Sequence, residues 1–428
     1  LGRAVQFARW RKTSTGDYER VDVDPPAKVV QTILSSGSCR QLKRLEAVTT
    51  APTLRPDGTI ICQPGFDAET GILLDMQDEI PVPAEPTVDQ ARAALALLLQ
   101  PFRKFPFASP LDRAVLLAAL LTAVVRPALD TAPAFGVTAP TQGSGKTLLA
   151  CCVGALGVGA KPAIAPHIDR AGDDEIRKRL LALLLEGERA VVWDNVVGEL
   201  DSAAFAALLT SKFYSDRLLG KSASAKARNA ALWLITGNNL TLTGDLVRRV
   251  ATLRLEPTEE APHRRAFDFD PLASVIRQRR EMVVAALTLV RAWLTSGDPP
   301  VAGAVGSFES WDRFVRQTVA WCSRRLDPDL EDPAAAFDQA QAADPEREIL
   351  AALLTALRQR FGSHCFTARE IEALVERVNE RSVPSTVADK AVVDALHDID
   401  KRPKMSARSI GRLLTSRQGC RVDGHRIV

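Results

Sequence analysis

The sequence lacks the patterns that mark disulfide-rich and zinc-binding proteins. Its seven cysteines include no CxxC pair, and its five histidines show no zinc-ligand spacing. These absences exclude the disulfide framework of a small secreted domain and give no sign of a metal centre built from cysteine or histidine. We therefore expect a reducing, cytoplasmic environment.

Long apolar runs and a strong net charge are also missing. The longest apolar run, residues 114–125, is shorter than the roughly 20 residues that cross a bilayer, so we expect no membrane association. No signal peptide is visible, and the chain begins at Leu1 rather than Met, as a piece of a longer protein would. The formal net charge is only +3 over 428 residues, so the chain is not a polycation.

Basic residues nevertheless gather in two places, residues 212–228 and residues 401–428. The second segment holds eight Lys or Arg against a single acid, Asp423. Charge runs of this kind are most often solvated surface, and they become nucleic-acid contacts only in a suitable structural context.

Hydrophobic patterning divides the chain into parts. Its length alone predicts two to three domains at about 150 residues each. We expect a small mixed or β-rich N-terminal region (1–85), a helical part (86–132) and an α/β core (133–260). A helical region (261–343) and a compact basic domain (344–428) should follow.

Two helices are expected in the second part. Residues 87–100 carry an apolar stripe at helical spacing, formed by Ala91, Ala94, Leu95 and Leu98. Ser109 is the expected N-cap of the next helix, with Pro110 at its first position and Asp112 in its first turn.

Short apolar runs alternate with helical segments in the central part. The runs are AFGVTA, RAVVWDN, ALWLITG and VATLRLE. Strands that alternate with helices predict an α/β layer with a mainly parallel sheet. We expect Asp194 and Asn238 to lie where the second and third runs end, because parallel sheets bind ligands at the carboxyl ends of their strands.

The segment APTQGSGKT, residues 139–147, follows the first apolar run and opens a helix, which is the context of a phosphate loop. Backbone amides at Gly143 and Gly145 can surround a β-phosphate, Lys146 can reach the β- and γ-phosphates, and Thr147 can ligate Mg²⁺. We expect ATP to be bound by Gly143, Ser144, Gly145, Lys146, Thr147 and Leu148.

One departure from the usual pattern and one alternative interpretation bear on this motif. The strict pattern has glycine where this chain has Pro140, a position that serves the turn more than the phosphate. The alternative is an ordinary glycine-rich turn with a surface lysine, and it leaves the preceding strand and the following helix unexplained.

The downstream runs supply the rest of an ATP site. Asp194 can hold Mg²⁺ through water, and Asn238 can orient the attacking water. Arg248 and Arg249 precede the last apolar run, where a guanidinium can reach the γ-phosphate of a neighbouring subunit. Taken singly, these residues fit ordinary strand ends, turns and surface arginines, but their order and spacing favour one site.

The motifs GSGKT, VVWDN, LITGNN and DLVRR, in that order, resemble those of AAA+ helicase domains of superfamily III. The likeness is greatest to the primase–helicases of phages, plasmids and mobile elements, and it is strongest over residues 133–255. It is weaker in GSFESWDRFVRQTVAWC and in the C-terminal part, and PTLRPDGTIICQPGFDAETGIL is similar to the segment that these proteins carry ahead of their ATPase. The resemblance implies an AAA+ P-loop ATPase in a hexameric or higher ring, ATP bound between subunits, translocation on DNA and a possible primase module.

The resemblance also implies a role for each motif residue. It places the arginine finger at Arg249, less firmly at Arg248, and the other roles at Lys146 and Thr147 (Walker A), Asp194 (Walker B) and Asn238 (sensor). Many relatives carry a second acid after the Walker B aspartate, where this chain has Asn195, which cannot accept a proton at neutral pH. Glu199, Asp201 or a water held by Asp194 and Asn238 can replace it, or hydrolysis is slow.

DNA contacts are expected in both basic segments. In the family, the stretch equivalent to residues 212–229 includes a β-hairpin in the ring channel, so Lys221, Lys226 and Arg228 are candidates to neutralise phosphates, with SASA at the tip. A flexible basic loop is the alternative, and Arg217 can equally face the nucleotide.

The C-terminal part has the pattern of a winged helix. It shows helix-length segments at 345–361, 367–379 and 385–397, with Thr367 and Glu370 at capping-box spacing. The basic segment that follows aligns three candidate DNA contacts along a final helix: Arg408, Arg412 and Arg417. Winged helices also mediate protein contacts, which is the alternative.

Three functions compete for the whole chain. The preferred one is an ATP-dependent DNA helicase or translocase that acts in the replication of a mobile element. A slowly hydrolysing, ATP-switched DNA-binding or loader protein is the second, favoured by Asn195. A P-loop kinase is the third, and the long segment between Asp194 and Asn238 and the arginine pair have no place in it.

Overall fold

The computed structural model describes residues 7–35, 43, 45–167, 172–217, 224–257, 269–380, 385–400, 402, 405–422 and 424–427. The chain forms two compact units. One comprises Leu1–Val48 and Phe66–Leu73, and the other comprises Thr49–Gly65 and Leu74–Val428. None of the described helices is long and apolar enough to cross a membrane.

The first unit contains an antiparallel hairpin and a helix. The hairpin pairs β1 (Phe7–Lys12) with β2 (Tyr18–Val23), and the helix is α1 (Ala27–Ser35). Three further short strands follow along the chain: β3 (Ala47–Thr49), β6 (Gly65–Asp67) and β7 (Ile72–Leu74).

The expected N-terminal region, residues 1–85, is divided between the two units. Strands β4 (Thr53–Leu54) and β5 (Ile60–Ile61) belong to the second unit. Leu54 is fully buried in the main hydrophobic core, and the Thr53 hydroxyl donates to the Val124 carbonyl at 3.1 Å. Sequence patterning gave no sign of this anchoring, because it depends on contacts between distant segments.

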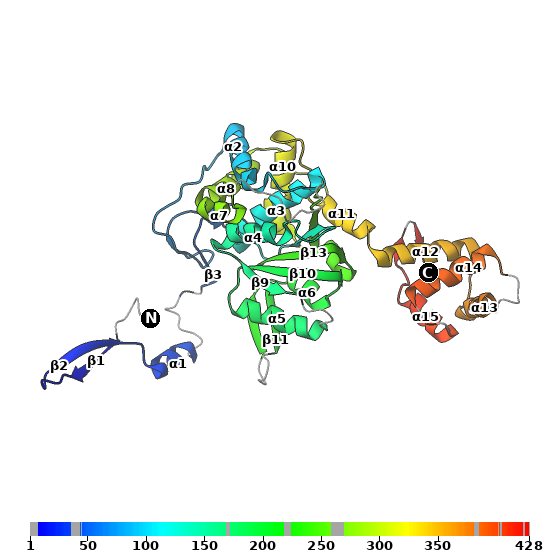
Figure 1. The fold of residues 1–428 in the computed structure, drawn as a ribbon, viewed down its shortest axis with the longest axis horizontal. Coiled ribbons are helices and arrows are strands. Elements are labelled where there is room, and N and C mark those ends of the chain that lie inside the picture. The colour runs from blue at the N-terminus through cyan, green and yellow to red at the C-terminus, as the bar shows by residue number, and fades with distance from the viewer. Residues whose placement is uncertain are drawn as a thin grey trace. The chain divides into compact units, whose positions relative to one another are not determined.

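A parallel sheet of five strands forms the centre of the second unit (Figure 1). In spatial order the strands are β14 (Val250–Arg254), β8 (Ala134–Ala139), β13 (Leu232–Leu242), β10 (Ala190–Leu200) and β9 (Ala163–Pro166). Every neighbouring pair is parallel, which confirms the predicted α/β layer. Strand β9 was not among the predicted runs, since its apolar segment is only four residues long and ends in proline.

Helices cover both faces of the sheet (Figure 1). α3 (Pro110–Val125) and α4 (Lys146–Val158) lie on one face, while α5 (Asp173–Leu185) and α6 (Ala203–Leu209) lie on the other. The short helices η1 (Gln100–Phe102), η2 (Arg126–Ala128) and η3 (Gly244–Arg248) complete the connections. The expected helical flanks are α2 (Val88–Leu99), α7 (Pro271–Arg277), α8 (Arg279–Thr295), α9 (Glu309–Trp311), a π-helical turn η5 (Asp312–Arg316), α10 (Gln317–Arg325) and α11 (Ala335–Ala342).

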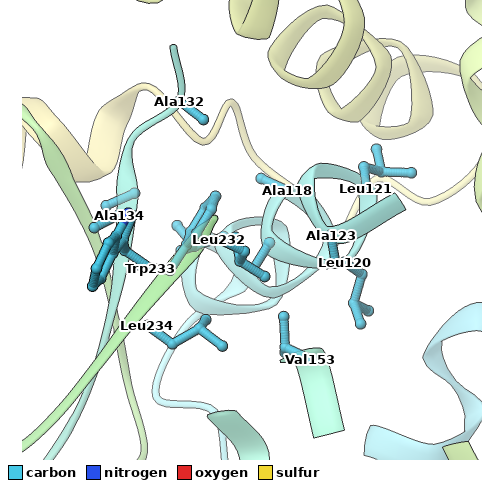
Figure 2. Close-up of a cluster of buried hydrophobic side chains, with 14 of the residues drawn as sticks. Ala118, Leu120, Leu121, Ala123, Ala132, Ala134, Val153, Leu232, Trp233 and Leu234 are labelled. Carbon is cyan, nitrogen blue, oxygen red and sulfur yellow. The ribbon is translucent and has the colours of Figure 1, made fainter. Parts of the chain in front are cut away.

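Alternation along the central strand β13 explains the two-faced packing. Leu232 and Leu234 point toward α3 and Val153 of α4, whereas Trp233 points to the other side (Figure 2). There the rings of Trp233 and Phe205 from α6 pack in a T-shaped arrangement at a centroid distance of 5.5 Å. Because successive strand residues face opposite sides, a near-continuous apolar run is what a sheet buried on both faces requires.

The two predicted N-terminal helices of this unit are confirmed. In α2 the buried residues are the predicted stripe, Ala91, Ala94, Leu95 and Leu98. Helix α3 begins with Pro110 after the N-cap Ser109, whose side chain accepts from the Asp112 amide.

The C-terminal residues form a helical domain with its own core. It comprises α12 (Pro345–Phe361), α13 (Ala368–Asn379), α14 (Val387–Ile399), α15 (Ala407–Thr415) and the small hairpin of β15 (Arg421–Val422) and β16 (His425–Arg426). The capping box of Thr367 and Glu370 is present at the start of α13, as predicted. Its buried cluster, which includes Leu353, Val392 and Ile410, shares no residue with the main core.

Candidate functional site

The loop between β8 and α4 has the backbone of a phosphate loop. Gly143 and Gly145 adopt φ values of +71° and +92°, in the left-handed region that glycine enters without strain. A Cβ on Gly145 would also lie only 3.3 Å from the Phe105 ring. Leu148, in the first turn of α4, completes the predicted segment, and the amides of this 13-residue helix open onto the loop.

Contacts within the loop hold Lys146 at the helix start. The Ser144 hydroxyl donates to the Thr141 carbonyl at 2.5 Å, and Lys146 Nζ donates to the same carbonyl at 2.9 Å. Partial burial lowers the pKa of Lys146, and the negative charge of Asp194 partly opposes this shift. A carbonyl is a neutral partner, so a phosphate oxygen that replaces it would form a stronger, charge-assisted bond.

The carboxylate of Asp194 collects hydroxyl groups from two directions. Its Oδ1 accepts from Thr147 Oγ1 at 2.7 Å and from Thr236 Oγ1 at 2.6 Å. Thr236 Oγ1 in turn accepts from the backbone N–H of Asn195 at 3.0 Å. The structure therefore brings Lys146, Thr147 and Asp194 together beyond the carboxyl end of β8, with Asp194 in the middle of β10. The sequence analysis expected the same three residues in one site.

Sequence reasoning missed Thr236. The residue is fully buried on β13, two positions before Asn238, and it lies on the same side of the strand. The alternation of the segment LITGNN contains this signal, because residues two apart on a strand share a face.

The strands β10 and β13 continue past Asp194 and Asn238, where the sequence predicted them to end. The register between them shifts after Trp193 and again after Val197. Asn195 and Asn239, each directly after a candidate residue, have left-handed φ values of +60° and +44°. Asparagine tolerates this conformation better than most residues, so the chain bends at both points without ending the strand.

Asn238 has a buried, unpaired acceptor. Its side-chain Oδ1 is buried and has no hydrogen-bond partner among the described residues. An orphan acceptor of this kind is costly unless a ligand or water supplies a donor. Asn238 Oδ1 could therefore accept a hydrogen bond from a water beside a triphosphate. Thr147 and Asp194 offer the oxygen ligands that Mg²⁺ prefers.

Arg248 and Arg249 lie at the amino ends of the strands, the edge of the sheet opposite the phosphate loop. Val250 pairs with Ala134, the first residue of β8, whereas the phosphate loop follows the last residue, Ala139. Five residues of strand separate the two edges by about 17 Å, at roughly 3.3 Å per residue. Arg248 and Arg249 are therefore too far from the phosphate loop of their own chain to complete it.

The two arginines differ in how they are held. Both bind Asp245, at 3.1 Å for Arg249. Arg249 also donates to the Ala206 carbonyl, and its side chain is only 18% exposed, against 60% for Arg248. Arg248 is thus the better presented to a neighbouring molecule, although the sequence interpretation preferred Arg249.

The two acids considered as replacements for Asn195 lie further along the chain, away from Asp194. Glu199 is exposed on the continuation of β10. Asp201 lies beside η3, 3.0 Å from a Cβ built on Gly244, and lines a pocket with Asp245 and Arg249. Asn195 itself is exposed.

The predicted basic hairpin is present in the described part of the segment. β11 (Phe213–Arg217) pairs antiparallel with β12 (Ser224–Arg228), so the second half of SASA is strand rather than tip. Lys221 lies outside the described residues. Lys226 is exposed, with its Nζ 4.6 Å from the centre of the Phe213 ring.

Arg228 lies at the base of this hairpin. It is half-buried and donates to the Pro127 carbonyl at 3.0 Å. The adjacent Arg126 is buried and donates to the carbonyls of Asn229 and Ala231. Arg228 therefore anchors the hairpin, and it is less well placed to meet DNA than Lys226.

The candidate C-terminal contacts lie on the outer side of α15. Ile410 and Leu414 are buried, and Arg408 and Arg412 are exposed on the opposite face of the helix. Arg417 lies beyond the end of α15 and donates to the Ser416 hydroxyl at 3.2 Å. Two of the three predicted arginines thus share an outward face.

Comparison with known proteins finds similar folds at low identity. No protein-family model and no curated protein matches the chain. The apo A form of the NrS-1 C-terminal region is 12% identical, covering 92% of this chain and 86% of that one, with a TM-score of 0.39. JCV helicase is 14% identical, covering 60% and 66%, with a TM-score of 0.25. The active helicase Cch of SCCmec type IV is 13% identical, covering 90% and 85%, with a TM-score of 0.30. At these scores the likenesses assign no activity to the chain.

Proposed function

We propose that this protein is an ATP-dependent DNA helicase or translocase of the AAA+ superfamily III type, which hydrolyses ATP between the subunits of a ring. The observation that carries the proposal is the cluster of Lys146, Thr147, Asp194 and Thr236, where the start of α4 meets two neighbouring strands of the parallel sheet, β10 and β13. A turn that merely happened to be rich in glycine would not require its threonine to meet a carboxylate two strands away.

Each residue of the cluster has a distinct task in this proposal. Bound Mg²⁺–ATP would supply the reactive γ-phosphate and a metal that neutralises its charge. Lys146 would give up the Thr141 carbonyl for phosphate oxygens, and Thr147 and Asp194 would hold the metal. Thr236 would fix the Asp194 carboxylate, and the orphan Oδ1 of Asn238 would accept a hydrogen bond from the attacking water.

The position of the arginines supports assembly into a ring. A guanidinium near the γ-phosphate stabilises the charge of the transition state, and Arg248 and Arg249 lie at the sheet edge opposite their own phosphate loop. A neighbouring copy can bring this edge to the loop, which makes ATP a ligand shared by two subunits. The proposed hexamer belongs to this part of the proposal.

DNA would be held through its backbone. Lys226 on β12 and the outward pair Arg408 and Arg412 on α15 are the exposed cations best placed for phosphates. In this proposal the C-terminal helices and the β15–β16 hairpin act as a winged-helix module. Contacts of this kind do not depend on base sequence, as a translocating motor requires.

A slowly hydrolysing, ATP-switched DNA-binding protein is the second candidate. Asn195 favours it, because the position after the Asp194 carboxylate holds a neutral amide, and Glu199 and Asp201 lie elsewhere. Such a protein would bind ATP and change its affinity for DNA without unwinding it.

One set of measurements separates the candidates. ATP turnover is measured with and without single-stranded DNA, together with strand displacement on a forked duplex and the particle mass with and without ATP. DNA-stimulated turnover with displacement by a nucleotide-dependent ring selects the helicase. Tight ATP binding with negligible turnover and no displacement selects the switch, and Lys146→Ala should abolish ATP binding in both cases.

A further inference from the structure

The β1–β2 hairpin carries an unusual outer face. Residues at alternate positions share a face, and the register opposes Trp10 to Arg20 and Lys12 to Tyr18. Ala8, Trp10, Lys12, Tyr18, Arg20 and Asp22 therefore form one side of the hairpin, called here the aromatic–basic face. All six residues are exposed.

The two aromatic side chains on this face are largely exposed. Trp10 is 69% exposed and Tyr18 is 66% exposed. The apolar residues that the hairpin half-buries, Phe7, Val21 and Val23, belong to the opposite face. Packing of the hairpin therefore does not account for the aromatic rings on the outer face.

We infer that the aromatic–basic face binds single-stranded nucleic acid. Bases stack on aromatic rings whatever their sequence, and neighbouring cations bind the phosphates between them. Here each ring is opposed across the strands by a cation, Arg20 beside Trp10 and Lys12 beside Tyr18. Diagonal neighbours in such a hairpin are about 7–8 Å apart, which leaves room for a separate base on each ring.

Charge supports this ligand over an apolar partner. A protein surface that docked on Trp10 and Tyr18 would have to bury Lys12 and Arg20, whereas a polynucleotide supplies an anion to each. The one acid of the face, Asp22, lies at its end and is 3.8 Å from Arg20, a long contact that phosphate can replace. The other ion pair of the hairpin, Arg11 with Glu19, is on the opposite face.

A hydrogen-bonded turn connects the two strands of the hairpin. Its turn is closed by the Thr13 amide donating to the Asp17 carbonyl at 2.7 Å, and Gly16 takes the left-handed φ of +96° that the turn needs. Because a two-stranded hairpin is only marginally stable alone, a bound nucleic-acid strand would also stabilise it. This site uses none of the residues that the proposed function assigns to ATP or to DNA.

Tryptophan fluorescence of the full chain tests the site directly. Of the six tryptophans, Trp193, Trp233, Trp311 and Trp321 are buried and Trp293 is half-buried, so Trp10 dominates the emission that iodide can quench. Oligo(dT) should quench this emission and shield it from iodide, because a base would cover the ring. Oligo(U) tests RNA in the same way, and quenching by either strand supports the site.

Two controls separate stacking from simple charge attraction. Heparin carries the negative charge without bases, and a duplex keeps its bases paired, so neither should quench Trp10. Equal quenching by heparin or by duplex, or oligo(dT) that leaves the emission and the iodide access of Trp10 unchanged, would overturn the inference. The Lys146→Ala variant, measured without nucleotide, should behave as the parent chain does, so the result is independent of the ATP site.

Variants extend the test to affinity. Trp10→Ala and Tyr18→Ala should each weaken binding of labelled oligo(dT) about tenfold, since stacking contributes roughly 1–3 kcal/mol per base. Trp10→Phe and Tyr18→Phe keep a ring and should keep most of the affinity, and Lys12→Gln should lower the salt dependence by about one phosphate. Alanine variants that bind as tightly as the phenylalanine variants would contradict the stacking role.

Discussion

At the scale of single residues, the candidate site depends on how one carboxylate is held. Asp194 Oδ1 accepts from Thr147 and Thr236, and both bonds are shorter than 2.8 Å. Thr147 would turn to the metal when nucleotide binds, which leaves Thr236 as the residue that fixes the carboxylate. Thr236 also holds the Asn195 amide, so one hydroxyl sets the geometry of two successive residues.

Thr236→Val should therefore impair turnover more than binding. Valine matches threonine in shape but lacks the hydroxyl, and a lost buried hydrogen bond costs about 1–3 kcal/mol. We expect kcat for ATP to fall about tenfold or more, with KM changed much less. Steady-state ATPase kinetics measure both values.

Two matched variants control this experiment. Thr236→Ser keeps the hydroxyl and should restore most of the activity. Thr241→Val removes a hydroxyl from the same strand, where it donates to the Asn239 carbonyl, and should have little effect. If Thr236→Val and Thr241→Val lower kcat equally, Thr236 has no special role.

A substitution at Asn195 tests whether the lack of an acid at this position limits hydrolysis. Its left-handed φ of +60° is also tolerated by aspartate, so Asn195→Asp adds a carboxylate with little backbone strain. A positioned general base contributes roughly 10²–10⁴-fold, so even a poorly placed one should raise kcat about tenfold. Single-turnover ATP hydrolysis measures the change, and an unchanged rate would mean that the attacking water needs no base at this position.

At the scale of elements, the sequence predicted those that local patterns determine. β8 matches the run AFGVTA residue for residue, and α2 buries its four predicted stripe residues. The cap at Ser109 and the capping box at Thr367 are likewise local hydrogen bonds, which residue type alone specifies. These signals need no knowledge of the rest of the fold.

Other features depend on distant partners, and the sequence did not show them. β10 and β13 run on past their candidate residues because each supplies the other with a hydrogen-bonding neighbour. Gly237 allows this, since a Cβ there would lie 2.7 Å from the Val196 carbonyl. Arg228 lies in a basic stretch of the sequence, yet it donates to the Pro127 carbonyl, which is 101 residues away in the chain.

An ion pair links β11 to α5, which gives a prediction for DNA coupling. Arg177 binds both oxygens of Asp216 on β11, at 2.8 and 2.9 Å. Arg177→Ala should loosen the hairpin and reduce the stimulation of ATPase by DNA, while the turnover without DNA is retained. Lys178→Ala, which removes an exposed pair within α5, is the matched control. Equal loss of stimulated and unstimulated turnover would contradict this role.

The pH dependence of the same pair follows from its charges. The hydrogen bonds from Arg177 hold the pKa of Asp216 below its ordinary value of 3.8. A lowered pKa means that the pair contributes its full stability above about pH 4 and loses it as the pH falls through the lowered pKa. From pH 6 to 8 the Asp216 carboxylate stays charged, so the protection of residues 213–217 from hydrogen exchange should not change with pH in the parent chain or in Asp216→Glu. Asp216→Asn lacks the charge and should lose this protection.

At the scale of the whole molecule, the two hydrophobic cores predict separable parts. The main core ends at Phe337, and the C-terminal core begins at Leu353. A chain that ends at residue 343 should therefore keep a cooperative thermal transition and ATP turnover without DNA, and it should bind DNA more weakly because Arg408 and Arg412 are absent. Calorimetry and a DNA titration test both points, and a truncated chain that fails to fold would show that the cores are not independent.

The central claim is that two copies of the chain build each ATP site, and mixing inactive variants tests it most directly. Lys146→Ala removes the phosphate-loop lysine, and Arg248→Ala with Arg249→Ala removes the guanidinium groups at the opposite sheet edge. Each variant alone should lack turnover, because every interface then lacks one half of the site. In mixed rings, some interfaces join an intact lysine to an intact arginine pair, so turnover should reappear and peak near equal proportions. Mass measurements that show mixed rings with no recovered turnover would contradict the shared site.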